Sequence, residues 1–255
     1  MQTKNLTNHR LGQVDVVILC GGLGSRLAGV VGDHPKPMAP IDRRPFLDIL
    51  IDYFSSFGFR RFVLCTGHRS QSIQEHYGAR GNSLEFVISD ERAALGTAGA
   101  VKNAEVFIES NPFLVANGDS FCPMDLVEFY DFHLKKRAVM SMAVVESENR
   151  KDAGRVAIDD CQRIVGFEEK GHRERGGVNA GIYFFQREML SLIPTNTNYS
   201  LEYGLFPKLV GSGSFAYICR EPLIDIGTPS RYERAKQYFG CNNAAVSERR
   251  VGMEP

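Results

Sequence analysis

The chain has 255 residues, 43% of them hydrophobic, so it is long enough and apolar enough to bury a core of its own. Its 30 basic residues balance 30 acidic ones, which excludes the strong overall field of proteins that bind nucleic acids or anionic membranes. We therefore expect neither nucleic acid nor a membrane as a partner, and any bound anion must be held by local groups.

The amino-terminal segment, residues 1–13, is polar and has no apolar region of the kind found in signal peptides. An apolar run at residues 14–20 follows it and predicts a buried strand. No run in the sequence approaches the roughly 18 apolar residues that a membrane span needs. We therefore expect a cytoplasmic protein.

A glycine-rich segment, LCGGLGSRL at residues 19–27, follows this first strand. Gly21, Gly22 and Gly24 allow positive φ angles and a close approach of backbone N–H groups to phosphate oxygens. Arg26 adds a cation beside them. The spacing fits neither GxxxxGK[ST] nor GxGxxG, so the segment predicts a different phosphate-binding turn or a purely structural one.

The next motif is HPKPM at residues 34–38, in which two prolines flank Lys36. Prolines stiffen the backbone in an extended form and thereby aim the ammonium group. Alternatively, Lys36 is an exposed lysine of a surface loop.

Helices and strands are predicted to alternate from here to residue 145, an order typical of a parallel α/β sheet. The predicted helices are residues 45–58, 70–77, 97–107 and 125–136. The predicted strands are residues 14–20, 62–65, 84–88, 113–116 and 139–145. Pro45 and Gly58 bracket the first helix as start and stop signals.

After residue 146 the pattern changes, with shorter strands predicted between polar loops, which indicates a partly antiparallel addition to the sheet. These strands are residues 155–158, 164–167 and 178–185. Two closing helices are predicted at residues 202–210 and 230–239, before a polar tail at 241–255 that we expect to be mobile. We expect one domain over residues 1–240.

Two aspartates each follow an apolar run. Asp119, in NGDS at residues 117–120, comes at the carboxyl end of a predicted strand, where open α/β sheets bind ligands. Asp225 ends the run in LIDIGTP, residues 223–229. Mg²⁺ is a natural partner for such carboxylates, because it completes its octahedron with waters and substrate phosphates. The alternative for Asp119 is a simple turn residue.

GGLGSRL followed by PKPM resembles the signature of the sugar-1-phosphate nucleotidyltransferases, the NDP-sugar pyrophosphorylases, and further matches run from about residue 14 to about residue 238. The resemblance implies an α/β fold with a Rossmann-like, mostly parallel mixed sheet flanked by helices and a partly antiparallel sugar-binding lobe. Residues 14–145 would be the nucleotide-binding half, and residues 146–240 the sugar-phosphate half.

The same resemblance implies the roles of individual residues. Arg26 and Lys36 would be the catalytic contacts to the phosphates, and Asp119 and Asp225 would bind Mg²⁺, for which Mn²⁺ could substitute. The implied nucleotide-binding residues are Leu19, Gly21, Gly22, Gly24, Ser25, Glu91, Gly96 and Thr97. The implied sugar-phosphate-binding residues are Asn117, Glu169, Lys170, Asn179, Gly181 and Glu202.

Some of these residues also have a structural interpretation. Thr97 can cap the helix that follows it, and Glu202 suits the first turn of a helix whether or not it binds a sugar. Gly96 is expected to let the nucleotide approach closely, and Gly181 to leave room for the sugar.

The implied reaction is an in-line attack by the sugar 1-phosphate on the α-phosphorus of a nucleoside triphosphate, with pyrophosphate leaving. The attacking oxygen is already ionised, so positioning and fixed cations suffice and we expect no catalytic His or Cys. The six cysteines show no CxxC pair and no zinc-type spacing, so we expect them to be reduced.

Residues 21–50 are most similar to family members that use GTP and a D-glycero-α-D-manno-heptose 1-phosphate, which implies these substrates. Glu91 is the candidate acceptor for the guanine N1–H and amino groups. Mannose 1-phosphate with GTP, or a hexose 1-phosphate with UTP or dTTP, stays an alternative, as do a glycosyltransferase and a non-catalytic regulatory subunit. The sequence leaves open whether the protein is a homo-oligomer and whether it supplies capsule, lipopolysaccharide or S-layer synthesis.

Overall fold

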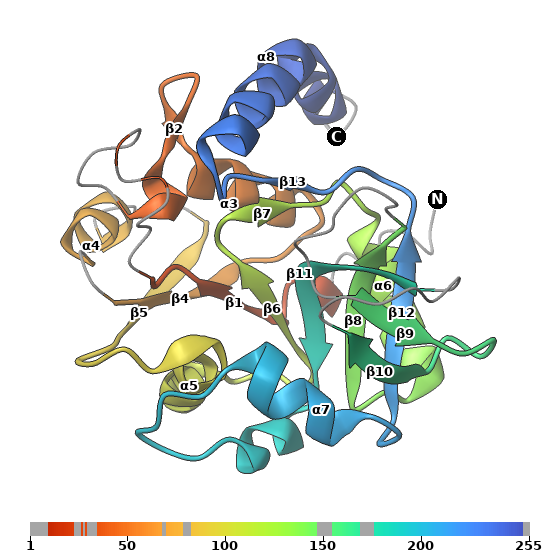
Figure 1. Ribbon diagram of the computed structural model, residues 1–255. Helices are drawn as coiled ribbons and strands as arrows, with labels where there is room; N and C mark the ends of the chain where they lie inside the picture. Colours follow the sequence, from red (N-terminus) through yellow and green to blue (C-terminus); the bar gives the residue numbers. More distant parts are fainter. Residues whose placement is uncertain are drawn as a thin grey trace.

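A computed structural model describes residues 10–22, 27, 29, 35–67, 70–78, 83–146, 155–168 and 176–251 of the chain. Within these ranges the chain forms a nine-stranded mixed sheet with helices on both faces (Figure 1). None of the helices in these ranges combines the length and the apolar composition that crossing a membrane requires.

The first half of the chain builds the parallel part of the sheet. β1 (Asp15–Leu19) lies between β4 (Arg61–Thr66) and β6 (Phe113–Asn117), and β5 (Glu85–Asp90) pairs with β4. β1, β4 and β6 are buried apolar runs, as strands covered on both faces must be. Because all of these strands run in the same direction, their carboxyl ends meet at one edge, the usual ligand-binding edge of an open α/β sheet.

The second half adds antiparallel pairs to the same sheet. β11 (Gly176–Phe185) is antiparallel to both β6 and β8 (Met140–Val145), and β12 (Ser214–Cys219) runs parallel to β8. β9 (Arg155–Ile158) and β10 (Ile164–Glu168) form a hairpin that continues the sheet beside β11. The predicted mixed sheet with a partly antiparallel second half is thus confirmed.

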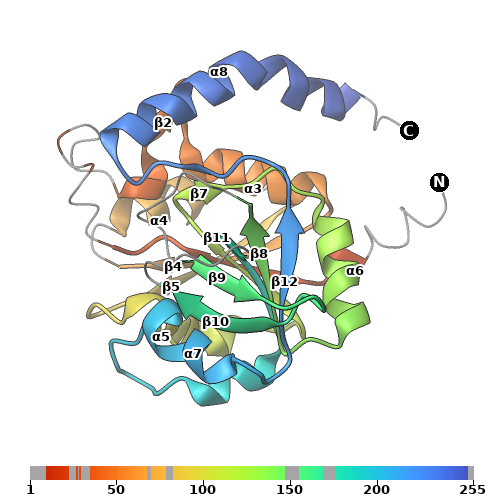
Figure 2. The same cartoon turned by 45° about the vertical axis from the view of Figure 1, so that its right-hand side comes forward.

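Helices cover each face of the sheet over a separate buried cluster (Figures 1 and 2). One face carries α3 (Phe46–Ser56), α4 (Gln71–Gly78), α6 (Leu126–Lys136) and α8 (Pro229–Val251). The other face carries α5 (Gly96–Asn103), η2 (Ala104–Phe107), η3 (Arg187–Leu192) and α7 (Phe206–Leu209). Side chains along β1 point alternately to the two faces, so Val16 and Ile18 belong to the first cluster and Val17 belongs to the second.

Three predicted helices differ from the observed ones. α8 continues to Val251, so residues 241–251, which we expected to belong to a mobile tail, are helical. The helix predicted at residues 202–210 is a π-helical turn, η4 (Leu201–Leu205), followed by α7. Pro207 has no N–H to donate to the carbonyl four residues earlier, which prevents one continuous α-helix. α5 ends at Asn103 and continues as the tighter turn η2.

The strands that we did not predict are β12 and several very short ones. β2 (Pro40–Ile41) and β3 (Arg44–Pro45) form a hairpin whose turn residues, Asp42 and Arg43, both have positive φ. β7 (Ser120–Phe121) and β13 (Ile224–Asp225) form a second two-residue pair. Strands of this length show no alternation in the sequence, yet the β7 and β13 pair brings the two predicted metal-binding aspartates together.

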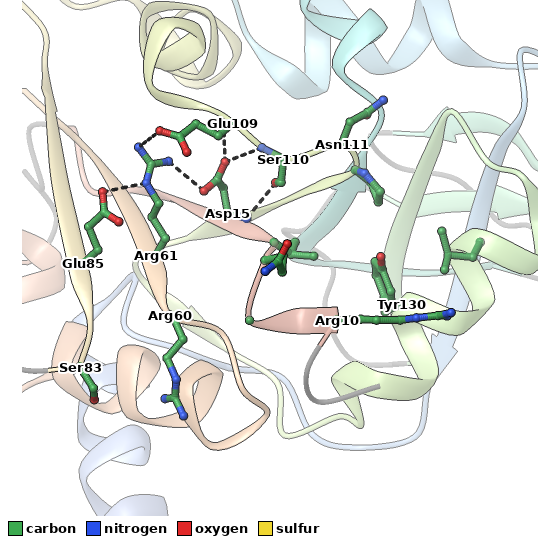
Figure 3. A pocket seen from close by; sticks show the side chains of 15 residues that line it. Arg10, Asp15, Arg60, Arg61, Ser83, Glu85, Glu109, Ser110, Asn111 and Tyr130 are labelled. Atoms are coloured by element: carbon green, nitrogen blue, oxygen red, sulfur yellow. Dashed lines mark hydrogen bonds and ion pairs between the residues drawn. The ribbon is translucent and has the colours of Figure 1, made fainter. Parts of the chain in front are cut away.

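The amino ends of β1 and β4, at the opposite edge, are held by a network centred on the buried Asp15 (Figure 3). Asp15 accepts hydrogen bonds from Arg61 (2.9 Å) and from the N–H groups of Glu109 (2.5 Å) and Ser110 (2.8 Å). Arg61 also pairs with Glu85 and Glu109, at 2.9 and 3.0 Å. The open depression of about 840 Å³ beside this network is therefore lined by charges that neutralise one another, and it lies away from the ligand-binding edge.

Candidate active site

The glycine turn begins where β1 ends. Gly22 has a φ of +118°, and a Cβ atom on Gly21 would lie 3.4 Å from Glu91 Oε1. The start of the predicted phosphate turn therefore lies against a carboxylate from the end of β5. Gly24, Ser25 and Arg26 lie outside the described residues, as do Glu169 and Lys170 of the predicted sugar-phosphate site.

Glu91 is fixed at the carboxyl end of β5 by its backbone and by one carboxylate oxygen. Its N–H donates to the carbonyl of Thr66 (2.8 Å), and its Oε2 accepts from the N–H of Leu95 (3.0 Å). Burial raises the pKa of the Glu91 carboxyl above its ordinary value, against the lowering effect of the Leu95 hydrogen bond. One oxygen thus orients the turn into α5, and the other faces Gly21.

The LGTAG segment packs tightly against the loop that precedes η4. Gly96 has a φ of +69°, and a Cβ there would lie 2.8 Å from the carbonyl oxygen of Tyr199. The hydroxyl of Thr97 accepts the N–H of Leu201 (2.8 Å) and does not cap α5, so that prediction is wrong. The close approach that Gly96 allows is to the protein's own backbone, which positions the end of α5 beside η4.

Glu202, at the start of η4, is hydrogen-bonded to this segment. Its Oε2 accepts from the hydroxyls of Thr97 (3.1 Å) and Ser200 (2.9 Å). Ser200 in turn caps the first turn of η4 by accepting the N–H groups of Glu202 and Tyr203. A predicted nucleotide residue and a predicted sugar residue therefore form a single hydrogen-bonded unit.

Lys36 meets Asp119 across the ends of β1 and β6. In the single turn η1 (Lys36–Met38), Lys36 Nζ lies 2.8 Å from Asp119 Oδ2, with the side chains 17% and 31% exposed. The turns are also in contact through Pro37, whose Cγ would lie 3.1 Å from a Cβ on Gly118. Gly118 donates its N–H to the carbonyl of Leu19 (3.0 Å), which places the PKP and NGD motifs at the end of the central strand.

Asp225 lies beside Asp119 because β13 pairs with β7. Asp225 is opposite Ser120 in the register, and the N–H of Ile226 donates to the carbonyl of Asp119 (3.1 Å). Asp225 Oδ1 accepts the N–H of Gly227 (2.9 Å) and lies 3.4 Å from Nη1 of Arg231. The structure thus brings together two aspartates that the spacing of the sequence could not connect; their role as metal ligands stays a prediction.

The donor set fits an ion that prefers oxygen ligands, such as Mg²⁺ or Mn²⁺, better than zinc. In the described part of the chain, no group of three or more His, Cys, Asp or Glu side chains forms a metal cluster. Two carboxylates on neighbouring strands suit an ion that fills its octahedron with waters and phosphate oxygens. Zinc, by contrast, takes a fuller set of nitrogen and sulfur ligands from the protein.

On the sugar side, the register of β11 shifts between Asn179 and Tyr183, where Gly181 has a φ of +76°. Asn179 accepts the N–H of Gly181 (2.9 Å) and donates to the hydroxyl of Tyr183 (2.7 Å). A Cβ on Gly181 would lie 2.7 Å from Asn117 Nδ2, so Gly181 leaves room for Asn117. Asn117 Oδ1 is shielded from solvent and has no hydrogen-bond donor among the described residues.

Sequence reasoning did not select two residues of this site, Tyr183 and Arg231. Burial, with a contribution from the nearby Glu202 carboxylate, raises the pKa of Tyr183, so its hydroxyl stays neutral while it orients Asn179. Arg231 is a basic residue in the first turn of α8, six positions after Asp225, and that proximity in the sequence is its only signal.

Comparisons with known proteins place this site in a family. The family model described as nucleotidyl transferase matches residues 15–240. The D-glycero-alpha-D-manno-heptose 1-phosphate guanylyltransferase of Aneurinibacillus thermoaerophilus is 31% identical over 225 residues, which cover 88% of this chain and 97% of the relative. The mannose-1-phosphate guanylyltransferase of Mycobacterium tuberculosis is 32% identical, with 87% of this chain matched to 63% of the relative.

A solved structure agrees in fold and sequence. HddC from Yersinia pseudotuberculosis superposes with a TM-score of 0.78 at 33% identity, covering 89% of this chain and 99% of HddC. A second structure of HddC, complexed with GMP-PN, superposes with a TM-score of 0.77.

Proposed function

The chain belongs to the nucleotidyl transferase family, and on that premise we propose that it transfers a guanylyl group from GTP to D-glycero-α-D-manno-heptose 1-phosphate, releasing pyrophosphate. The observation that carries the proposal is the meeting of Lys36, Asp119 and Asp225 at the ligand-binding edge of the sheet. A cation and two adjacent carboxylates suit a reaction in which two phosphate groups must meet.

The proposed reaction assigns a role to each charged residue of the site. Lys36, with Arg26, would bind the triphosphate and stabilise the charge that develops on it. Asp119 and Asp225 would hold Mg²⁺, which neutralises phosphate charge when bound. No proton needs to be removed from the attacking phosphate, so the side chains mainly position the substrates.

Recognition of the two substrates falls to the flanking groups. Glu91 Oε1, which faces the glycine turn, would accept hydrogen bonds from the guanine N1–H and amino groups. Asn117 Oδ1 is a shielded acceptor that a sugar hydroxyl can satisfy, and Asn179 and Glu202 lie on neighbouring elements. Glu169 and Lys170 would complete the sugar-phosphate site.

Mannose 1-phosphate is the second candidate acceptor, because the Mycobacterium tuberculosis enzyme is as similar in identity. The heptose phosphate is favoured because two relatives named D-glycero-alpha-D-manno-heptose 1-phosphate guanylyltransferase match 88% and 90% of this chain, at 31% and 30% identity. Both candidates use the same nucleotide, so the guanylyl donor is the firmer part of the proposal.

The test is pyrophosphate release from GTP and heptose 1-phosphate by the intact chain and by Asp119→Asn and Asp225→Asn. Each substitution should lower kcat about a hundredfold, the usual size of a single electrostatic contribution. Asp131→Asn, an exposed aspartate of α6, is the matched control and should keep full activity. Full turnover in excess EDTA would show that the metal assignment is wrong.

A further inference from the structure

Both aspartates of the proposed metal site are paired with a cation. Asp119 contacts Lys36 at 2.8 Å, and Asp225 contacts Arg231 at 3.4 Å. Asp225 is the more enclosed of the two carboxylates, since its side chain is 9% exposed and that of Asp119 is 31% exposed. The formal charges of these four groups cancel, so each carboxylate has a compensating cation before any substrate binds.

We propose that Arg231 is a phosphate-binding cation, held on Asp225 before the substrates bind and transferred to the metal-bound triphosphate when they do. The inference rests on the metal site of the proposed function. Gly227 favours this arrangement, because a Cβ there would lie 2.9 Å from Asp225 Oδ1 and 3.9 Å from Arg231 Nη1. With no side chain between them, the carboxylate and the guanidinium stay in direct contact.

The transfer follows from the charges. A metal ion held by Asp119 and Asp225 competes with Arg231 for the carboxylate and weakens their attraction. A triphosphate bound through such an ion would place phosphate oxygens near Asp225, and Arg231 already contacts this carboxylate. A guanidinium pairs with phosphate through parallel hydrogen bonds, so Arg231 exchanges one anionic partner for another without being left unpaired.

One consequence is that metal ion and nucleotide should bind cooperatively. A metal ion alone must compete with Lys36 and Arg231 for Asp119 and Asp225, and it brings no anion that could accept these two cations. The triphosphate supplies that acceptor. The presence of GTP should therefore strengthen metal binding, and by linkage the metal should strengthen GTP binding by the same factor.

The test measures the dissociation constant of Mn²⁺ by electron paramagnetic resonance, with and without GTP and in the absence of sugar phosphate. Arg231→Met removes the charge and keeps most of the aliphatic stem. Without GTP, this variant should bind Mn²⁺ about fivefold more tightly than the natural chain, because one partly shielded ion pair no longer competes for Asp225. The addition of GTP should then strengthen Mn²⁺ binding less than it does in the natural chain. Arg231→Lys should retain most of the natural behaviour.

Arg234→Met is the matched control, because Arg234 is an exposed arginine of the same helix and its loss changes the net charge equally. If Arg231→Met bound Mn²⁺ alone no more tightly than the natural chain, or if Arg234→Met showed the same gain, the inference would be overturned. Asp225→Asn distinguishes a failure of the proposed metal site from a failure of the role proposed for Arg231. Unchanged Mn²⁺ binding in that variant would overturn the metal site itself, whereas lost binding there with no gain in Arg231→Met would overturn only the role of Arg231.

Discussion

Lys36 connects the PKP motif with Asp119 of the proposed metal site. It opens the 3-10 turn η1 between Pro35 and Pro37, where an extended backbone was expected, and its ammonium contacts Asp119 at the end of β6. Lys36→Ala should lower kcat about a hundredfold, because it removes a fixed cation from the place where charge develops. Steady-state kinetics with both substrates checks this, with Lys135→Ala on the exposed side of α6 as control. A rise in KM for GTP at unchanged kcat would instead mean that Lys36 only binds the ground state.

Glu91 is the residue on which the choice of base should depend. Glu91→Gln keeps the shape of the side chain but replaces one acceptor oxygen with an amide, so it should lower kcat/KM for GTP by roughly tenfold to a hundredfold, the worth of a hydrogen bond to a charged group. Inosine triphosphate lacks the amino group of guanine, so Glu91→Gln should lower its kcat/KM less than that for GTP.

The measurement for Glu91 is the ratio of kcat/KM for GTP to that for inosine triphosphate. Glu85→Gln, at the opposite end of the same strand, is the control and should leave that ratio unchanged. If Glu91→Gln also left the ratio unchanged, another group must read the guanine amine.

Among single residues, those that carry charge at the end of an apolar run were predictable. Asp119 and Asp225 were selected in this way, but their adjacency depends on the two-residue strands β7 and β13, which have no sequence signal. Contacts set by tertiary packing were not predictable. Gly181 makes room for the Asn117 amide, and Thr97 bonds to the backbone of η4.

Among the structural elements, the turn into α5 is one of the most tightly packed. Gly96→Ala should destabilise the fold by about 2 kcal/mol, because the added Cβ meets the Tyr199 carbonyl at 2.8 Å in a left-handed backbone conformation. Gly78→Ala at the end of α4 is the control, since a Cβ there has no neighbour within 4 Å. Urea unfolding measures both variants, and equal midpoints would contradict the packing described here.

The contact between α6 and the sheet contains a buried histidine. His133 Nδ1 lies 2.9 Å from Ser141 Oγ on β8, and its Nε2 lies 3.1 Å from Gln186 Nε2. Burial lowers the pKa of His133 from 6.5 to about 4, so the folded protein keeps the ring neutral where the unfolded chain already binds a proton.

The free energy of unfolding should therefore fall as the pH drops from 6.5 towards 4, by up to about 3 kcal/mol from this residue, and this contribution should level off below that range. His133→Gln keeps polar atoms beside Ser141 and removes the titration. Urea unfolding of both proteins at pH 7, 5.5 and 4.5 gives the difference. Parallel pH dependences for the two would contradict the assignment.

Elements with strong apolar runs were predicted within a few residues, as for β1, β4, β6 and α3. The three strands are continuous apolar runs because both faces of the sheet are covered, and α3 shows apolar residues at helical spacing. The end of α8 was missed because a polar helix has no apolar stripe to mark it, and η4 because tertiary packing and Pro207 override helix propensity. β12 was missed although half of its residues are buried, since its mostly apolar sequence, SFAYIC, does not alternate clearly between apolar and polar residues.

At the scale of the whole molecule, the two predicted halves share one sheet. β6 of the first half pairs with β11 of the second, and Asn117 lies beside Gly181 at that junction. Glu202 and Thr97 join the halves again on the face that carries α5. Each substrate can therefore be held by residues from both halves. A substitution in one half should also change the binding of the substrate assigned to the other half.

The most direct test of the proposed function is kcat/KM for pyrophosphate release with GTP, ATP, CTP, UTP and dTTP, each paired with heptose, mannose and glucose 1-phosphates. We predict that GTP with D-glycero-α-D-manno-heptose 1-phosphate exceeds every other pair, with GTP and mannose 1-phosphate next. Several hydrogen bonds to guanine should separate GTP from the other nucleotides by about a hundredfold or more. A preference for UTP or dTTP with glucose 1-phosphate would contradict the guanylyl-heptose assignment.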